Sequence, residues 1–181
     1  MITQSHKKIA IIGCAGSGKT TIAFALQQKF NLPLYHLDDY YWLSNWQRVG
    51  IEKFTEIHTE LCAQDAWIME GVYLKLLPER LKQTDVLIFL DMPRYKCFWN
   101  VFKRSILGYG TVIPGSPSGC KQHIFTRKFL EFLIWIWNFN KKYRKIILDN
   151  IEQAQGKKQI YILKSIKEID QFVKMISDSN H

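Results

Sequence analysis

The stretch GCAGSGKTT, from Gly13 to Thr21, decides the fold of this chain. Its spacing matches the pattern G-x-x-x-x-G-K-S/T, with Gly18, Lys19 and Thr20 at the fixed positions after Gly13. This spacing lets successive backbone N–H groups surround a β-phosphate while a helix begins at the base of the loop. The apolar run KKIAIIGC precedes it and IAFALQQKF follows it, as expected for the strand and helix that such a loop joins.

The residues of this loop have separate expected roles. Lys19 is expected to reach the β- and γ-phosphates, and Thr20 to place its hydroxyl on Mg²⁺. Gly16 is a further position at which the backbone can approach a ligand closely or adopt a positive φ. The predicted nucleotide-binding residues are Gly13, Ala15, Gly16, Ser17, Gly18, Lys19, Thr20 and Thr21. The predicted cofactors are ATP and Mg²⁺; the alternative is a glycine-rich turn with no ligand.

Length and composition limit the class of protein. With 181 residues and 47% hydrophobic residues, the chain can bury one sizeable core, so we expect a single domain over 1–181. No apolar run reaches the roughly 20 residues of a membrane span, and the first residues lack a secretory signal. We therefore expect a soluble cytoplasmic protein without a membrane partner. The net charge of +9 favours anionic ligands in general, namely nucleotides, phosphorylated metabolites, nucleic acid or anionic lipid.

Strand and helix patterns alternate along the chain. Strands are predicted at Lys7–Cys14, Leu32–Asp38, Ala66–Gly71, Asp85–Pro93 and Gln159–Ser165, and helices near 50–64, 73–82, 94–107, 126–154 and 166–177. This alternation predicts an α/β fold with a parallel sheet covered on both faces. Ligands of such folds bind at the carboxyl ends of the strands. The glycine- and proline-rich stretch GYGTVIPGSPSGC, Gly108–Cys120, is expected to form a mobile loop.

Carboxylates follow the second predicted strand. Asp38 and Asp39 are adjacent, and we choose Asp38 because it directly ends the apolar run. A carboxylate there could orient or deprotonate an acceptor hydroxyl beside the γ-phosphate, or hold Mg²⁺ through water. The alternative is a pair of helix-capping aspartates. His36, within the strand pattern, is expected to pack in the core rather than act in catalysis.

The third and fourth strands end in further candidates. Gly71 would let a substrate lie close to the backbone, and Glu70 supplies another carboxylate. Asp91 could hold a magnesium-bound water at the end of the fourth strand. An ordinary turn and a helix cap are the respective alternatives.

Basic residues precede the glycine-rich loop. Arg94, Lys103 and Arg104 approach it, and cations on a closing loop would neutralise charge on a transferred phosphoryl group. The alternative is a solvated helix face. We find neither the N-K-x-D motif of a switch GTPase nor the long second domain of a motor, so a kinase is favoured.

The run FLEFLIWIWNFNKKYRK, from Phe129 to Lys145, is apolar almost all round and then basic. We interpret it as a helix that packs on the core. The alternatives are a homodimer contact and, because aromatic and basic residues alternate, stacking on single-stranded nucleic acid such as DNA.

Several motifs in series resemble a known group. IIGCAGSGKTTIA, LPLYHLDDYYW, WIMEGVY, IFLDMPR and FLEFLIWIWNF are similar to segments of the bacterial P-loop proteins called DNA topology modulation proteins, relatives of adenylate kinase and shikimate kinase. The resemblance implies a kinase-type P-loop NTPase fold, a five-stranded parallel sheet in the order 2-3-1-4-5, and a lid after strand four, over 104–126. It also implies that Asp38 binds the acceptor and that Arg94 and Arg104 lie in the lid region.

The sequence thus predicts an ATP- and Mg²⁺-dependent phosphotransferase acting on a nucleotide, nucleoside or other small hydroxylated metabolite. The predicted catalytic residues are Lys19, Asp38 and Arg104. The substrate is expected to be bound by Asp38, Asp39, Gly71 and Arg94. The metal is expected to be bound by Thr20 and Asp91. Two alternatives stay open: an ATP-binding regulator that contacts DNA, and a P-loop protein that binds nucleotide without efficient transfer. The second arises because the lid sequence contains no arginine between Gly108 and Cys120.

Overall fold

The computed structural model describes residues 2–113, 115–154, 156 and 158–178. Five parallel strands form its main sheet, in the spatial order β2-β5-β1-β6-β7. These strands are β1 (Lys8–Gly13), β2 (Leu34–His36), β5 (Trp67–Glu70), β6 (Val86–Leu90) and β7 (Gln159–Leu163). Counted along the chain among the five, this order is 2-3-1-4-5, so the predicted α/β fold and strand order are confirmed.

The three central strands form the middle of the core. Every residue of β5 and β6 is buried, as are residues 9–13 of β1. Their continuous apolar sequences suit strands that are covered on both faces. Parallel pairing brings Gly13 beside Leu90 and His36 beside Glu70 at the carboxyl ends of the strands. The edge of the sheet that carries the predicted ligand site is therefore built by residues far apart in the sequence.

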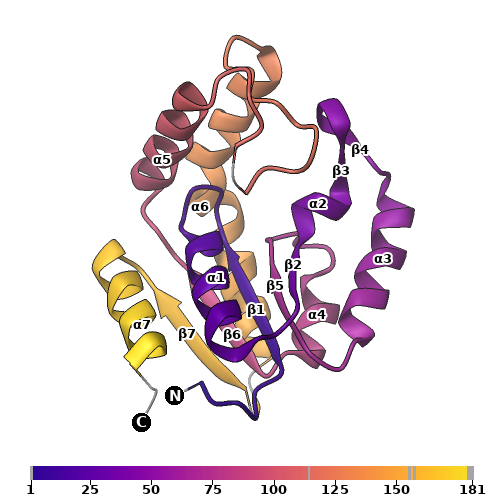
Figure 1. The fold of residues 1–181 in the computed structure, drawn as a ribbon, viewed down its shortest axis with the longest axis vertical. Coiled ribbons are helices and arrows are strands. Elements are labelled where there is room, and N and C mark those ends of the chain that lie inside the picture. Colours follow the sequence, from indigo (N-terminus) through magenta and orange to yellow (C-terminus); the bar gives the residue numbers. More distant parts are fainter. Residues whose placement is uncertain (1, 114, 155, 157, 179–181) are drawn as a thin grey trace.

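Helices cover both faces of the sheet (Figure 1). Helix α1 (Lys19–Phe30) packs beside α7 (Ile166–Asp178) on one face, and α6 (Arg127–Gln153) runs behind the sheet with α4 (Leu77–Gln83). Helix α5 (Arg94–Leu107) packs against α6. The 27 residues of α6 span about 40 Å. Its first half therefore projects beyond the sheet together with α5 (Figure 1).

The segment after β2 differs from the prediction. The expected strand Leu32–Asp38 is wrong at its end, because β2 stops at His36 and helix α2 (Leu37–Tyr41) begins at once. Leu37 is fully buried, while Asp38 and Asp39 occupy the first turn of α2, where carboxylates are favourable. A small hairpin then follows, with β3 (Trp42–Leu43), a 3₁₀ turn (Ser44–Trp46) and β4 (Gln47–Arg48), before α3 (Ile51–Ala63). No pattern in the sequence predicted this hairpin.

The predicted lid segment, 104–126, begins inside a helix. Arg104 belongs to α5, and the described residues from Gly108 to Thr126 form no helix and no strand beyond one bridge between Tyr109 and Gln122. The loop rests on the β3–β4 hairpin. The backbone N–H of Asn45 donates to the Gly119 carbonyl at 3.2 Å, and the Trp46 indole N–H to the Lys121 carbonyl at 2.8 Å. Mobility of this loop stays a prediction.

The phosphate-binding loop also packs tightly against α5. Gly16 has a φ of +74°, and a Cβ added there would lie 2.5 Å from the Cys97 carbonyl oxygen and 2.9 Å from a Val101 methyl. Asn100 of α5 donates from its side-chain amide to the Gly16 carbonyl at 2.9 Å. The shape of the loop is thus set partly by a helix that follows it by about 80 residues.

We predict that Gly16→Ala destabilises the protein much more than Gly110→Ala. Both glycines have a φ near +75°, but nothing lies within 4 Å of a Cβ built at Gly110. Gly110→Ala should therefore cost only about 1 kcal/mol of backbone strain, and Gly16→Ala about 1–3 kcal/mol more because α5 must move. Urea denaturation without nucleotide measures both. Equal losses for the two variants would show that the contact between Gly16 and α5 does not constrain the loop.

Candidate active site

The phosphate-binding loop ends in an uncapped helix. Gly18, with a φ of 102°, precedes α1 and makes no side-chain capping bond, and no acidic residue occupies the first turn. The N–H groups of the first helical turn have no intrahelical acceptor, and the helix dipole adds positive potential there. Ser17 adds a buried hydroxyl that has no hydrogen-bond partner among the described residues. This set of donors fits an anionic phosphate group.

Lys19 lies folded over the loop. Its ammonium donates to the Cys14 carbonyl oxygen at 3.1 Å, which holds the positive charge above the backbone donors. The structure thus brings together the loop, Lys19 and the start of α1, as the motif predicted.

A carboxylate at the end of β5 meets the loop from the other side. The Thr20 hydroxyl donates to Glu70 at 3.0 Å from Oε1 and 3.2 Å from Oε2. His36, the last residue of β2, is hydrogen bonded through Nδ1 to the same carboxylate. The expectation that His36 packs in the core is wrong, because its side chain stays 21% exposed and pairs with Glu70.

The pKa shifts agree with an ion pair between His36 and Glu70. The hydrogen bond to Glu70 raises the pKa of His36 above its ordinary value of 6.5, although partial burial opposes the rise. Burial alone would raise the pKa of Glu70, but the His36 hydrogen bond and the charge of Lys19 outweigh it and lower that pKa. Glu70 is therefore an ionised carboxylate in contact with the predicted metal-binding hydroxyl.

Thr20 and Glu70 provide a donor set that fits Mg²⁺. Mg²⁺ prefers oxygen ligands and commonly binds through one or two carboxylates together with substrate phosphates. Within the described part of the chain, no three His, Cys, Asp or Glu residues gather into a metal cage. A metal at Thr20 would accordingly depend on the bound phosphates as well as on Glu70.

Asp91 has a different partner. Arg144 of α6 donates from Nε to both Asp91 oxygens at 2.9 Å, and its Nη2 lies 2.8 Å from Oδ2. This ion pair joins the end of β6 to the long helix. The metal role of Asp91 stays a prediction.

Asp38 of α2 contacts the turn that follows β5. Asp38 accepts a hydrogen bond from the Tyr73 hydroxyl at 2.6 Å, and burial raises the pKa of the neighbouring Asp39. Gly71 has a φ of +135°, and the space beside its Cα is filled by the Leu37 side chain, 2.9 Å from a built Cβ. Asp38 is thus oriented by the turn that follows β5.

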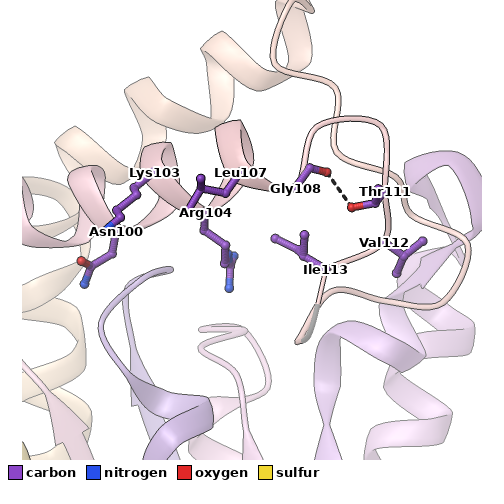
Figure 2. A pocket seen from close by; sticks show the side chains of 8 residues that line it. All are labelled: Asn100, Lys103, Arg104, Leu107, Gly108, Thr111, Val112 and Ile113. Carbon is purple, nitrogen blue, oxygen red and sulfur yellow. Dashed lines mark hydrogen bonds between the residues drawn. The ribbon is translucent and has the colours of Figure 1, made fainter.

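Two arginines take different places. Arg104 points from α5 into the space above the phosphate-binding loop (Figure 2). The loss of hydration around the Arg104 guanidinium lowers its pKa, while the negative charges of Asp38 and Glu70 oppose this shift. Arg94 instead lies over the Trp137 ring of α6, 4.6 Å from its centroid.

A cavity of about 450 Å³ opens between α5 and the loop that follows it, 108–126, which we call the lid loop (Figure 2). Its walls combine polar and cationic groups of α5 with apolar side chains of the loop, namely Asn100, Lys103, Arg104, Leu107, Gly108, Thr111, Val112 and Ile113. Gly115, further along the loop, lies over Thr20: a Cβ built there would be 3.7 Å from the Thr20 hydroxyl. The lid loop therefore covers the end of the site that carries Thr20.

Sequence reasoning missed two groups. Glu70 was noted only as a further carboxylate, and its pairing with Thr20 and His36 depends on the register between β2 and β5. Arg80 is fully buried in α4, where its Nη2 donates to the Val72 carbonyl at 3.2 Å. Its Nε and Nη1 have no partner among the described residues, and no motif indicated it.

Comparison with known families identifies the class of nucleotide-binding domain. The family model called NB-ARC domain matches residues 1–104, more than half of the chain. The chain belongs to the NB-ARC domain family of P-loop NTPases. The NB-ARC match contains the phosphate-binding loop, Asp38, Glu70 and Arg104, and ends before the lid loop.

One curated relative and two solved structures are similar to this chain, and the structures share its fold. The "Uncharacterized protein YqaC" of Bacillus subtilis (strain 168) is 28% identical over 130 residues, which cover 70% of each chain. Shikimate kinase from Acinetobacter baumannii, in complex with shikimate, matches with a TM-score of 0.61 and 14% identity over 98% of this chain and 97% of that one. Shikimate kinase from Bacteroides thetaiotaomicron has a TM-score of 0.56 and 19% identity over 94% and 95%. The predicted kinase-type P-loop fold is confirmed; the likeness to topology modulation proteins stays a prediction.

The His36–Glu70 pair predicts a pH-dependent stability. Because the pKa of His36 is raised in the folded state, the stabilisation that His36 contributes is complete below the ordinary pKa of 6.5. This stabilisation is lost as the pH rises through the folded-state pKa. Because the pKa of Glu70 is lowered, its contribution is present above 4.5 and is lost as the pH falls through the folded-state value. His36→Gln should therefore cost about 1–3 kcal/mol near pH 6 and much less at alkaline pH.

Urea denaturation of the wild type and His36→Gln between about pH 5 and pH 9 measures this difference. The exposed His123 provides the control, since His123→Gln should show no such trend. A His36→Gln penalty that is the same at every pH would contradict an ionic pair.

Proposed function

We propose that the chain is an ATP- and Mg²⁺-dependent phosphotransferase that acts on a nucleotide, nucleoside or other small hydroxylated metabolite. The observation that carries this proposal is the placement of two kinds of group at one edge of the sheet. Thr20, in the first turn of α1, contacts Glu70 at the end of β5, and Asp38 of α2 contacts Tyr73 just beyond the end of the same strand. Arg104 lies near enough for its charge to interact with both carboxylates.

On the donor side, the backbone donors of the loop and the Lys19 ammonium would hold the β- and γ-phosphates. Thr20 and Glu70 would hold Mg²⁺ together with phosphate oxygens, and the bound metal would neutralise part of the triphosphate charge. Glu70 is the better-placed carboxylate, because Asp91 would have to leave Arg144 to take this role. Arg104 would stabilise the charge of the transferred phosphoryl group.

On the acceptor side, Asp38 would orient the attacking hydroxyl and accept its proton. The hydrogen bond from Tyr73 keeps Asp38 in one position before an acceptor arrives. Catalysis would then consist of positioning and charge neutralisation, as in other phosphoryl-transfer sites. Asp39, Gly71 and Arg94 stay predicted substrate-binding residues, and the cytoplasm is the proposed compartment.

A second candidate function is nucleotide binding without efficient transfer. It is favoured by the lid loop, whose described residues from Gly108 to Cys120 contribute no arginine to the site. In that case ATP would bind, and no acceptor would be phosphorylated.

The proposal predicts acceptor-dependent release of ADP from ATP and Mg²⁺. Nucleosides, nucleoside monophosphates and small hydroxylated metabolites form the panel, and one class should raise release well above the background hydrolysis by water. Lys19→Ala should lose nucleotide binding or turnover. Asp38→Asn should keep the ATP affinity of the wild type and lose about 10²–10⁴-fold in acceptor-dependent turnover.

Each result of this experiment distinguishes between the candidate functions or between the roles proposed for single residues. A flat panel with measurable ATP binding would reject the phosphotransferase and support the second candidate. Unchanged turnover in Lys19→Ala would remove the phosphate-binding loop from the reaction. Loss of ATP affinity together with turnover in Asp38→Asn would move Asp38 from the acceptor to the metal.

A further inference from the structure

The positive charge of the chain is concentrated in one segment. The range 94–145 contains eleven of the 25 Lys and Arg residues but only one of the 16 Asp and Glu residues, so it carries +10. The whole chain carries +9, which leaves the remaining residues at −1. This segment is α5, the lid loop and most of α6. Seven of the eleven basic residues lie on α5, the loop after it and the first half of α6, which is the part of the molecule that projects beyond the sheet (Figure 1).

The same segment carries most of the exposed apolar surface. Of seventeen exposed large hydrophobic side chains among the described residues, twelve lie between 95 and 146. They are Tyr95, Trp99, Ile106, Leu107, Tyr109, Val112, Phe125, Leu130, Phe132, Ile134, Trp137 and Ile146. Phe125 is 86% exposed, Leu107 78% and Trp99 59%. Exposed large apolar groups gathered in this way are typical of interaction sites.

Contacts between rings join the two helices into one surface. Trp137 of α6 packs edge-on against Phe98 of α5 with 5.8 Å between the ring centroids. Phe98 stacks on Phe102 at 6.1 Å, and Trp99 lies 6.2 Å from Phe102. We call the exposed face of α5 and α6 around these rings the aromatic face.

The stripe of α6 that leads away from Trp137 has a regular composition. Leu130, Ile134, Trp137 and Lys141 follow one another at intervals of four, three and four residues, so they share one side of the helix. This side is apolar near the lid loop and becomes basic towards the middle of α6. An apolar stripe that merges into lysines is typical of helices that lie at a membrane surface.

The lysines of the 94–145 segment lack counter-ions among the residues that the structure describes. Six of them are exposed and form no ion pair with any described residue, namely Lys96, Lys103, Lys128, Lys141, Lys142 and Lys145. The single acid of this segment, Glu131, is already paired with Arg127 at 2.8 Å. The positive potential of the aromatic face is therefore not neutralised within the segment.

We propose that the aromatic face docks on the surface of a bilayer that contains anionic lipids. Trp99, Trp137 and the neighbouring aliphatic side chains would enter the interface, while the lysines would contact anionic headgroups. A second copy of this chain fits less well, because dimerisation would bring two strongly positive surfaces together. Nucleic acid fits less well too, because Leu107, Leu130 and Ile134 offer it no stacking partner.

This docking requires no membrane span. None of the helices in the described ranges is long and apolar enough to cross a bilayer. The expectation of no membrane partner came from the absence of such a span, and it does not bear on attachment to the surface. Asn100 and Arg104 of α5 line the cavity near the phosphate-binding loop, so docking would hold the proposed active site close to the lipid surface.

Sedimentation with vesicles tests the proposal. The 181-residue chain should bind vesicles of phosphatidylcholine mixed with phosphatidylglycerol at least about tenfold more tightly than vesicles of phosphatidylcholine alone, because several lysines face the headgroups. The double variant Lys96→Glu/Lys141→Glu, which changes one exposed lysine beside Trp99 on α5 and one on the Trp137 side of α6, should lose about tenfold or more in binding to the mixed vesicles. Lys167→Glu/Lys174→Glu places the same charge change on exposed positions of α7 and should bind like the wild type.

Two substitutions of exposed apolar residues test whether the aromatic face enters the lipid interface. Trp99→Ser should weaken binding to the mixed vesicles severalfold, whereas Ile166→Ser, at an exposed position of α7, should not. If the lysine variants on α5–α6 and on α7 lost vesicle binding equally, binding would depend on net charge alone, and the proposal would be overturned. Absence of vesicle binding would overturn it as well, and a concentration-dependent dimer or a tighter complex with an oligonucleotide would then name the other occupant.

Discussion

The Glu70 carboxylate is the group on which the arrangement of the site depends. A buried carboxylate is costly unless hydrogen bonds compensate for its lost hydration. Glu70 receives those bonds from Thr20 at the start of α1 and from His36 at the end of β2. One side chain therefore fixes the phosphate-binding loop relative to the strand that leads into α2.

Helix α5 supplies the second constraint. One side of it meets the loop, through the Cys97 carbonyl against Gly16 and through the Asn100 amide. Its exposed side carries Trp99 and belongs to the aromatic face. The nucleotide site and the proposed lipid-binding surface thus share one rigid helix. A ligand at either place would therefore lie close to the same helix.

The sequence was sufficient for the fold because its strongest signals are local. The motif around Lys19 and the alternation of apolar strands with helices required no knowledge of long-range contacts. The strand order, which came from the resemblance to a known group and not from local patterns, is confirmed as well. The α2 helix and the β3–β4 hairpin were missed because they depend on distant partners. Trp46, for example, donates to the carbonyl of Lys121, 75 residues later.

The same limit applies to the side chains of the site. The sequence could propose Lys19, Thr20 and Asp38 as site residues because they belong to the motif or stand beside a strand end. The contact of Glu70 with His36 depends on which strands become neighbours, and Asp91 is bound by Arg144 across 53 positions. Arg80, buried in α4, left no signal because isolated basic residues of helices are usually solvated.

The effect of Mg²⁺ on ATP affinity in Glu70→Gln tests the central claim most directly. Titration calorimetry of the wild type, Glu70→Gln and Asp91→Asn, each with and without Mg²⁺, gives the required comparison. If Thr20 and Glu70 form the metal end of a nucleotide site, Mg²⁺ should tighten ATP binding in the wild type and in Asp91→Asn. Glu70→Gln should lose about tenfold or more of that gain. Full enhancement by Mg²⁺ in Glu70→Gln would contradict the account.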